Sequence, residues 1–326
     1  MGRRLPPVSD HPPDREPASG GTASALAPRL QVLAAALLFS TGGVAIKAVH
    51  LAGWQVACLR SALAAVALLV LLPGARRALR AGVSPGMLLV GATYGTTLVL
   101  FVLGNKLTTA ANTIFLQSTA PLYVLLLSPW ALGERVRRRE VAYMAALALG
   151  IGLFFLGRRP PDALAPDPFL GNLVAAGAGV TWAATLLGLR ALGRRGAGGG
   201  RDPGAAAVLL GNLFACAAAA PLALADLEPL ARARPADWAL LAYLGVVQVA
   251  LAYVFLTRAF RRLEALEASL LLLVEPIFNP VWTWIGHGEE PGPWGLAGGA
   301  VILGATAAKT LWDARAARRR ALSSRP

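Results

Sequence analysis

The sequence predicts an all-α polytopic membrane protein, a bundle of apolar helices that cross a lipid bilayer. Of its 326 residues, 56% are hydrophobic and only 15% are charged, and the mean hydropathy is +0.57. Soluble domains carry about 25% charged residues. The apolar residues come in runs of about 20, the length a helix needs to cross roughly 30 Å of hydrocarbon. This composition excludes a disordered chain, a coiled coil and a disulfide-stabilised secreted fold.

Ten apolar runs follow one another, and Pro and Gly mark the turns between them. Only helices satisfy their backbone hydrogen bonds within one segment in lipid. The expected spans are 30–49, 54–72, 86–104, 109–129, 140–157, 168–189, 204–225, 236–257, 264–285 and 294–312. Residues 1–28, rich in Pro, Ser and charge, are expected to form a disordered cytoplasmic tail, and residues 313–326 a basic one.

The basic residues predict the orientation of these spans. Most of the 31 Lys and Arg lie in the two tails and in the loops after the second, fourth, sixth and eighth spans. The positive-inside rule therefore places both termini in the cytoplasm of a multi-pass plasma (inner) membrane protein. These charges set topology and have no aromatic residues interleaved with them. The net charge of +14 thus indicates no nucleic-acid partner.

Cysteine and histidine are too sparse to predict a disulfide framework or a metal site. Cys58 and Cys216 both fall inside apolar runs, where they are expected to pack as small side chains. No other cofactor is indicated, and neither H-E-x-x-H nor a Walker A motif is present. The string Gly82-Val83-Ser84-Pro85-Gly86 matches G-x-S-x-G but lacks the strand that this motif requires. No catalytic residue is therefore expected, and the chain is predicted not to be an enzyme.

The two halves of the chain repeat one another at an offset of 155 residues. Pro121 aligns with Pro276, and each is followed by eleven residues and then by Gly-Glu. The predicted units are 29–157 and 168–312, each with five spans. An odd number of spans makes the two copies enter the membrane from opposite sides. Inverted repeats of this kind are typical of secondary transporters, with the substrate site near the midplane between the halves.

At these residues the sequence resembles the EamA-type family of the drug/metabolite transporter superfamily. The resemblance covers about 30–312 and includes Arg60 in span two and Lys47 late in span one. One departure is Ser40-Thr41-Gly42, where the family often has Trp-Gly. The matching pieces are Thr119-Ala120-Pro121, Leu132-Gly133-Glu134-Arg135, Glu275-Pro276 and Gly288-Glu289. The resemblance implies carrier-mediated movement of a small metabolite, often outward, through a central cavity.

Glu275 is the most informative polar residue, because a carboxylate halfway along a span costs roughly 2.5–3.5 kcal/mol on insertion scales. Asn279 and Trp282 share its helix face and would continue a polar cavity wall. The alternative is a structural Glu that fastens helices together. Pro276 removes a backbone hydrogen bond beside it and would let the helix open.

Two cations lie within the early spans and are candidates for a charge partner or a gate. Arg60 lies about 9 Å inside the outer end of span two, at 1.5 Å per residue. It either extends to the outer surface or reaches Glu275, and the first is favoured. Lys47 is nearer the surface and is expected to anchor there, on the same face as Ser40.

Further polar and aromatic residues within the spans fit either a cavity wall or helix–helix hydrogen bonds worth about 0.6 kcal/mol each. Gly91-x3-Gly95 and Gly295-x3-Gly299 are expected to be packing seams rather than dimer contacts. Glu134 and Glu289, at the starts of spans five and ten, are expected to be structural helix-start carboxylates. The candidate cavity residues are Glu275, Asn279, Trp282, Asn112, Thr119, Tyr123, Tyr94, Trp182 and Ser40.

The sequence thus predicts a secondary transporter that moves a small metabolite by alternating access, as a monomer or a homodimer in the lipid bilayer. A cavity with one carboxylate, amides, hydroxyls and indoles suits an amino-acid-like substrate, and protons are the candidate coupling ion. Export is the expected direction. The alternative is a membrane-embedded enzyme or a receptor-like binding protein, neither of which would give saturable flux of an unchanged solute.

The predicted topology can be tested by reporter fusion. A fluorescent protein that folds only in the cytoplasm, fused after Pro326, should be bright, and alkaline phosphatase at the same site should be inactive. The matched control inserts alkaline phosphatase in the loop 158–167, where it should be active. The opposite pair of results would overturn the orientation.

Overall fold

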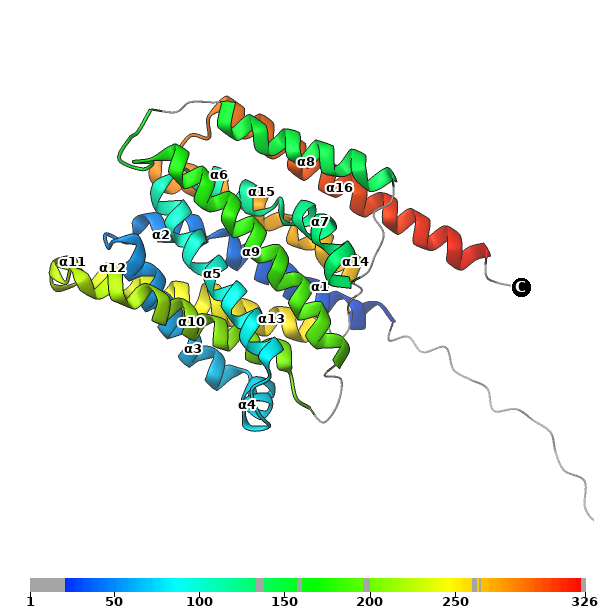
Figure 1. The fold of residues 1–326 in the computed structure, drawn as a ribbon, viewed down its shortest axis with the longest axis horizontal. Helices are drawn as coiled ribbons and strands as arrows, with labels where there is room; N and C mark the ends of the chain where they lie inside the picture. Colours follow the sequence, from blue (N-terminus) through cyan, green and yellow to red (C-terminus); the bar gives the residue numbers. More distant parts are fainter. Residues whose placement is uncertain are drawn as a thin grey trace, which may run out of the picture.

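The computed structural model describes residues 21–132, 138–156, 160–195, 200–259, 263 and 265–323, and within them all regular structure is helical (Figure 1). The longer helices pack side by side as a bundle. Their bounds are α1 (Gly21–Ser40), α2 (Gly42–Ala48), α3 (Gly53–Leu71), α4 (Pro73–Arg80), α5 (Pro85–Leu107), α6 (Ala110–Gln117), α7 (Ala120–Leu132), α8 (Arg138–Leu156), α9 (Pro168–Arg195), α10 (Pro203–Ala225), α11 (Glu228–Ala231), α12 (Pro235–Ala242), the π-helical η1 (Tyr243–Leu251), α13 (Ala252–Ala259), α14 (Ala265–Leu272), α15 (Val274–His287) and α16 (Pro293–Ser323).

Seven helical stretches of the described chain are long and apolar enough to cross a membrane. Residues Glu140–Leu156 form a shorter apolar helix. The chain is therefore a multi-pass helical membrane protein, and ten spans remain a prediction that would also count α8, α14 with α15, and α16. The seven stretches are Leu26–Ala48, Gly53–Leu71, Pro85–Leu107, Ala110–Leu127, Pro168–Gly193, Pro203–Ala225 and Pro235–Ala259.

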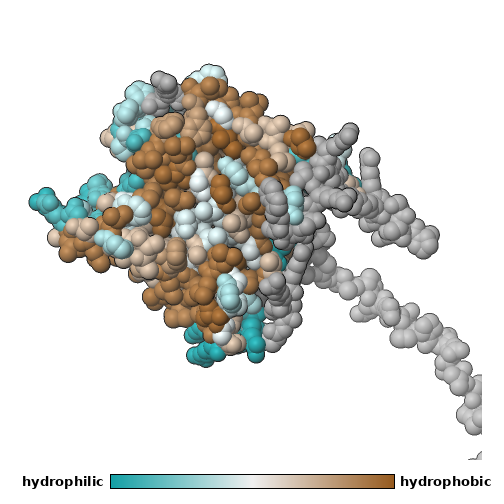
Figure 2. Space-filling model, in the orientation of Figure 1, coloured by the Kyte–Doolittle hydropathy of each residue, from teal (hydrophilic) through white to brown (hydrophobic). Residues whose placement is uncertain are grey.

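The outer surface of the bundle is apolar, as a lipid-facing surface must be. Leu89 and Val66 are 67% and 64% exposed, and Figure 2 shows hydrophobic residues over most of the visible face. Trp238, Trp294 and Trp312 are also exposed, close to expected span ends. Indole rings are enriched at that depth because they are apolar in the body and polar at the edge.

The structure moves both tail boundaries. Helix α1 begins at Gly21, so the expected disordered tail 1–28 is wrong at its end, and residues 1–20 lie outside the described residues. Helix α16 continues to Ser323, so most of 313–326 is helical. Ala is the most frequent residue in 21–28, and Ala and Arg dominate 313–323. Both are strong helix formers, which favours the extensions.

Two spans are broken at the same place of the repeat. Helix α6 ends at Gln117 and α7 begins at Ala120, and 155 residues later α14 ends at Leu272 and α15 begins at Val274. Proline cannot donate to the carbonyl four residues before it, and its ring clashes with that carbonyl. For Pro121 and Pro276 those carbonyls belong to Gln117 and Leu272, the last residues of α6 and α14. Paired breaks in corresponding spans point to the substrate site of an inverted repeat.

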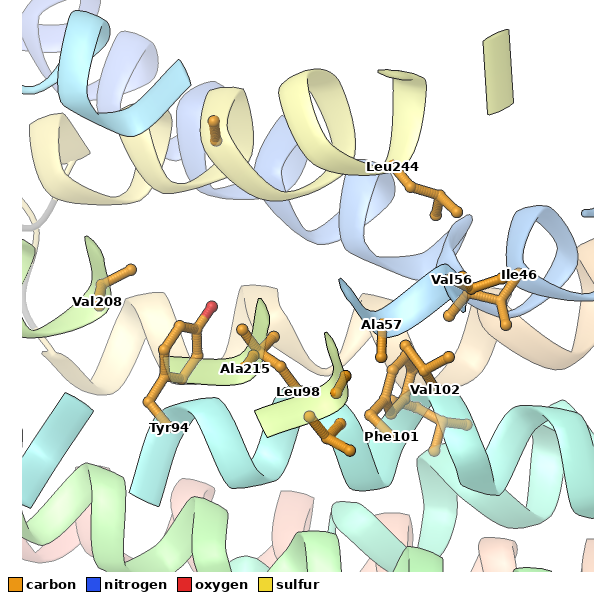
Figure 3. Packing of buried hydrophobic residues seen from close by; sticks show 14 of the residues in the cluster. Ile46, Val56, Ala57, Tyr94, Leu98, Phe101, Val102, Val208, Ala215 and Leu244 are labelled. Carbon is orange, nitrogen blue, oxygen red and sulfur yellow. The ribbon is translucent and has the colours of Figure 1, made fainter. Parts of the chain in front are cut away.

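The interior is closed by apolar side chains and by glycines where two helices touch. Figure 3 shows the core between α3, α5 and α10, with Leu98, Phe101 and Val102 of α5 among its residues. Along α5, Gly91 and Gly95 lie against Gly211 of α10, so this small-residue seam joins helices of one chain, as expected. Gly299 lies against Phe115 in the same way, joining α16 to α6.

The two cysteines meet between α3 and α10. Their sulfur atoms are 3.4 Å apart, and both thiols are free. They act as small packing residues, as expected, and the contact joins the two halves of the chain.

The glycine seam predicts a stability effect. In Gly95→Ala the new Cβ would lie 2.5 Å from the Gly211 carbonyl oxygen, so α5 and α10 must separate. We expect the free energy of unfolding to fall by about 1–3 kcal/mol, measured by thermal unfolding of the detergent-purified protein. Gly152→Ala is the matched control, because nothing lies within 4 Å of its new Cβ. Equal effects of the two substitutions would contradict the assignment.

Candidate functional site

Arg60 is an interior cation rather than a surface anchor. It lies in the second turn of α3, is only 2% exposed, and its Nε and Nη1 atoms have no hydrogen-bond partner among the described residues. The expectation that it extends to the outer surface is therefore wrong. The apolar residues around this turn of α3 keep the side chain inside the bundle, and a buried charge without partners is costly to hold in any fold.

Glu275 lies in the first turn of α15, directly after the break in span nine. It is half-buried, and within the described part of the chain it makes no hydrogen bond or ion pair. In particular, it forms no ion pair with Arg60, so the alternative prediction for Arg60, a pairing with Glu275, does not occur in this structure.

Tyr94 of α5 lies within electrostatic reach of both charged groups. It interacts electrostatically with both Arg60 and Glu275, and it is 3% exposed. Its ring lies 5.8 Å from that of Tyr253 on α13 and 6.2 Å from that of Trp182 on α9. Figure 3 shows the Tyr94 hydroxyl pointing away from its own helix.

We call Arg60, Tyr94, Asn212, Tyr253 and Glu275 the central polar cluster. Asn212, on α10, neighbours Tyr94 and leaves its Oδ1 without a hydrogen-bond partner in the described residues. Arg60 and Tyr94 come from the first half of the sequence and the other three from the second. The cluster therefore lies where the two repeats meet, which is where carriers of this architecture bind their substrates.

Three of the other candidate residues on spans one and nine lie in helix contacts. Trp282 donates from Nε1 to Ser40 Oγ at 2.9 Å, which fastens α15 to α1. Asn279 is fully buried against Gly43, and its Oδ1 and Nδ2 atoms have no hydrogen-bond partner among the described residues. Asn279 thus offers an unpartnered amide about one turn from Glu275.

The candidates on span four face other helices. Asn112 donates to Asn172 Oδ1 of α9 at 3.0 Å. Thr119, in the break between α6 and α7, donates to the Leu116 carbonyl of α6. Tyr123 lies beside Thr119 and Gly179. These contacts make Asn112 and Thr119 packing residues in this conformation, whereas Trp182 joins the ring of Tyr94 as described above.

Lys47 forms a buried ion pair at the predicted outer end. Its Nζ lies 2.9 Å from Glu289 Oε2, and both side chains are at most 3% exposed. Lys47 also donates to the carbonyls of Thr108, at 3.0 Å, and Leu164, at 2.6 Å. This one ammonium thus joins α2, the start of span four, the connection between the repeats and the loop before α16.

Glu289 caps a helix, but not the one expected. Helix α16 begins at Pro293, and Glu289 Oε1 instead accepts the Ala110 N–H, at 2.7 Å, in the first turn of α6. A carboxylate is favoured there because the first N–H groups of a helix lack partners and carry partial positive charge. Glu134, its counterpart in the first repeat, lies outside the described residues.

Several polar contacts escaped the sequence analysis. Asn212 and Asn172 are single amides in apolar runs, and such residues are rare enough in spans to be a usable signal. Asp237, fully buried, accepts from the His50 backbone N–H at 2.8 Å and from Arg234. Because Asp237 lies at the end of a predicted span, where charged residues are common, the sequence did not single it out. The described residues contain no group of three His, Cys, Asp or Glu side chains that would hold a metal ion.

Comparison with known families decides the class of the protein. The model of the EamA-like transporter family matches residues 28–156 and 169–309. The chain belongs to the EamA-like transporter family. The two matches coincide with the two repeats, which confirms the resemblance seen in the sequence.

The chain is also similar to two curated relatives and to a solved structure. The chain is 27% identical over 253 residues to the pseudopaline exporter CntI of Pseudomonas aeruginosa strains UCBPP-PA14 and PAO1, covering 76% of this chain and 83% of each relative. A solved structure described only as a crystal structure of a protein is 22% identical, covering 88% of this chain and 98% of that one, with a TM-score of 0.54. This likeness concerns the fold alone.

The Lys47–Glu289 pair predicts a large stability effect of removing one charge. Glu289→Gln keeps an acceptor for the Ala110 N–H but removes the carboxylate charge that lies 2.9 Å from the buried Lys47 ammonium. We expect the free energy of unfolding to fall by about 3–5 kcal/mol. Thermal unfolding of the purified protein measures this, and Lys47→Met added to Glu289→Gln should recover part of the loss.

The matched control is the exposed pair between Glu228 and Arg232, whose side chains are 64% and 78% exposed. Glu228→Gln should cost less than about 1 kcal/mol. If the two Glu→Gln substitutions had the same effect, the Lys47–Glu289 pair would not be the contact that closes this end.

Proposed function

We propose that this protein is a secondary carrier that exports a small polar metabolite across the plasma membrane by alternating access. The observation that carries the proposal is a pair of ionisable groups of opposite sign, Arg60 and Glu275, in the central polar cluster where the repeats meet; neither forms an ion pair with any residue that the structure describes. Uncompensated charges are expensive in a bundle interior, and in membrane proteins they mark substrate and ion pathways.

The fold supplies parts that can move around this cluster. The breaks before Pro121 and Pro276 divide two equivalent spans into halves, and Glu275 lies directly after one of them. At the predicted outer end, Lys47 and Glu289 hold the second repeat to the first. In the proposed cycle this structure is the state closed to the outside, and separation of Lys47 from Glu289 opens it.

The named relatives support export as the direction of transport, and the distribution of basic residues supports the proposed orientation in the plasma membrane. The pseudopaline exporters that this chain resembles are exporters by name, and the basic loops favour cytoplasmic termini and ten spans. A carrier whose outer end is closed and whose binding site takes up substrate from the cytoplasm fits both the exporter relatives and the predicted orientation.

Glu275 is the proposed coupling residue. The titratable groups that interact electrostatically with it are Tyr94 and Tyr253, and Tyr94 also interacts with Arg60. Because Glu275 lacks an ion-pair partner among the described residues, it is free to take up a proton in one state and release it in the other. Substrate export would then be driven by proton entry.

Glu275→Gln tests the coupling, because it keeps the shape and removes the titration. In proteoliposomes the variant should exchange substrate across equal concentrations at a near-normal rate. Accumulation driven by a pH gradient should fall to the level without a gradient. Glu290→Gln, outside the cluster, is the matched control. Unchanged pH-driven transport in Glu275→Gln would remove Glu275 from the coupling step.

Proteoliposome flux also tests the function itself. The metabolite pool of the host cell is loaded inside or outside the vesicles, and each solute is followed by mass spectrometry. A carrier gives a saturable flux of at least one solute, which reaches the other side chemically unchanged. Chemical change of the solute would indicate a membrane-embedded enzyme, and saturable binding without flux a receptor-like protein.

A further inference from the structure

We propose that Cys58 and Cys216 form a modification site, at which a hydroperoxide joins the two thiols in a reversible disulfide that restrains the two repeats. The part of this proposal that concerns transport rests on the proposed function. Its starting point is that the sequence contains only two cysteines, one in each half and 158 residues apart, whose sulfur atoms meet at 3.4 Å. Both thiols are free in this structure.

The packing of α3 against α10 allows the bond to form with little movement. Disulfide sulfur atoms lie about 2.05 Å apart, so the two thiols need to approach each other by about 1.4 Å. Buried alanines lie around the pair, Ala57 on α3 and Ala215 and Ala219 on α10, and their small side chains let the two helices pack closely. Small rotations of the two cysteine side chains are therefore expected to close the gap.

A second contact holds these helices together one turn away. Gln55 of α3 donates from Nε2 to the carbonyl of Ala223, at 3.3 Å, and to that of Asp226, at 2.7 Å, at the end of α10. These hydrogen bonds fix the position of α3 along α10, and with it the position of Cys58 opposite Cys216. The pair therefore lies in a defined contact between two helices of different repeats.

One of the two thiols is accessible from the outer surface of the bundle. Cys58 is buried, whereas Cys216 is half-buried. Leu213, one turn before Cys216 on the same side of α10, is exposed on the apolar surface. An oxidant that dissolves in hydrocarbon therefore reaches Cys216 first. A lipid hydroperoxide is such an oxidant, because its acyl chain lies in the bilayer and its O–O bond takes up two electrons.

The reaction proceeds in two steps whose atoms and electrons balance. The Cys216 sulfur attacks the hydroperoxide, the O–O bond breaks, an alcohol leaves with the thiol proton, and Cys216 becomes a sulfenic acid. The Cys58 sulfur then attacks this sulfur, the S–S bond forms, and the sulfenic hydroxyl leaves as water with the Cys58 proton. Because the second thiol is already in contact, its attack is intramolecular and precedes further oxidation. A small dithiol reverses the reaction by thiol–disulfide exchange.

The disulfide would restrain the movement that the proposed transport cycle requires. Helix α3 belongs to the first repeat and α10 to the second, so the bond joins the two repeats covalently. Arg60 lies two residues after Cys58, and Asn212 lies one turn before Cys216. The bond thus also holds together the helices that carry these two members of the central polar cluster. A carrier whose repeats must move relative to one another is slowed by it while remaining folded.

The bond itself is tested on the purified full-length protein. Cumene hydroperoxide is the apolar probe, and a maleimide counts free thiols after denaturation. We expect the count to fall from two to zero per chain, a cross-linked peptide that contains both cysteines, and recovery of both thiols with dithiothreitol. Cys58→Ala and Cys216→Ala are the controls, on helices where alanine already packs, and should give no cross-link within one chain. Two retained thiols, or sulfinic acid without a cross-link, would refute the proposal.

Thermal unfolding shows whether the native packing accommodates the bond. Because a cross-link between residues 158 apart restricts the unfolded chain, the oxidised protein should unfold roughly 4–8 °C above the reduced one. Dithiothreitol should abolish this difference, and the oxidant should cause none in Cys58→Ala. An equal or lower unfolding temperature of the cross-linked protein would mean that α3 and α10 distort to form the bond, contrary to the proposal.

Proteoliposome flux of the host metabolite pool tests the restraint. Flux through the oxidised protein should be at least roughly 10-fold slower than through the reduced one, because the repeats are held together, and dithiothreitol should restore it. Flux through Cys58→Ala should not respond to the oxidant. If the cross-linked protein transports at the full rate, the restraint is refuted and the carrier function stands. If the reduced protein carries no solute, the carrier function fails, and the thiol count and unfolding temperature still decide whether the disulfide forms.

Discussion

The structure depends on one constraint, that a backbone N–H or C=O in lipid must find its partner within the protein. Ten predicted spans meet it with continuous or nearly continuous helices. Pro121 and Pro276 are exceptions to this constraint. Each lacks the backbone N–H that would otherwise donate to the carbonyl four residues earlier. Such breaks are tolerated only where protein surrounds them or water reaches them. Their placement at equivalent positions of the two repeats brings irregular backbone and polar groups together in the interior of the described bundle.

The charges of the interior divide into two kinds. Lys47 and Glu289 are buried and fully engaged, with the ammonium also bound to two carbonyls and the carboxylate also bound to an N–H. Arg60 and Glu275, both within electrostatic reach of Tyr94, have no such partners in the described residues. Paired charges hold elements together, whereas unpaired charges in a bundle interior are costly and mark substrate and ion pathways. The chain thus contains ionic groups of both kinds, and the proposed function depends on the second.

Sequence reasoning predicted the helical membrane fold, the repeat and the family, because hydropathy, the basic loops and the Pro-x11-Gly-Glu spacing are local patterns. It also selected Glu275, Tyr94 and Trp182, which the structure places in or beside the central polar cluster. It could not predict that Arg60 is interior or that Glu289 caps α6, since both depend on contacts between residues far apart in the chain. Ser40 and Trp282 share a hydrogen bond that periodicity alone cannot reveal.

The double use of Glu289 has a mechanical consequence. One oxygen holds Lys47 of α2 and the other holds the first turn of α6, so any movement that withdraws Glu289 from the first repeat releases both at once. The Lys47–Glu289 ion pair and the hydrogen bond from the Ala110 N–H are therefore expected to break together rather than one after the other. In the proposed cycle, the end that the basic loops predict to be the outer one would therefore act as a two-position latch, shut or open, and the geometry of a single carboxylate would suppress leakage through a half-opened pathway.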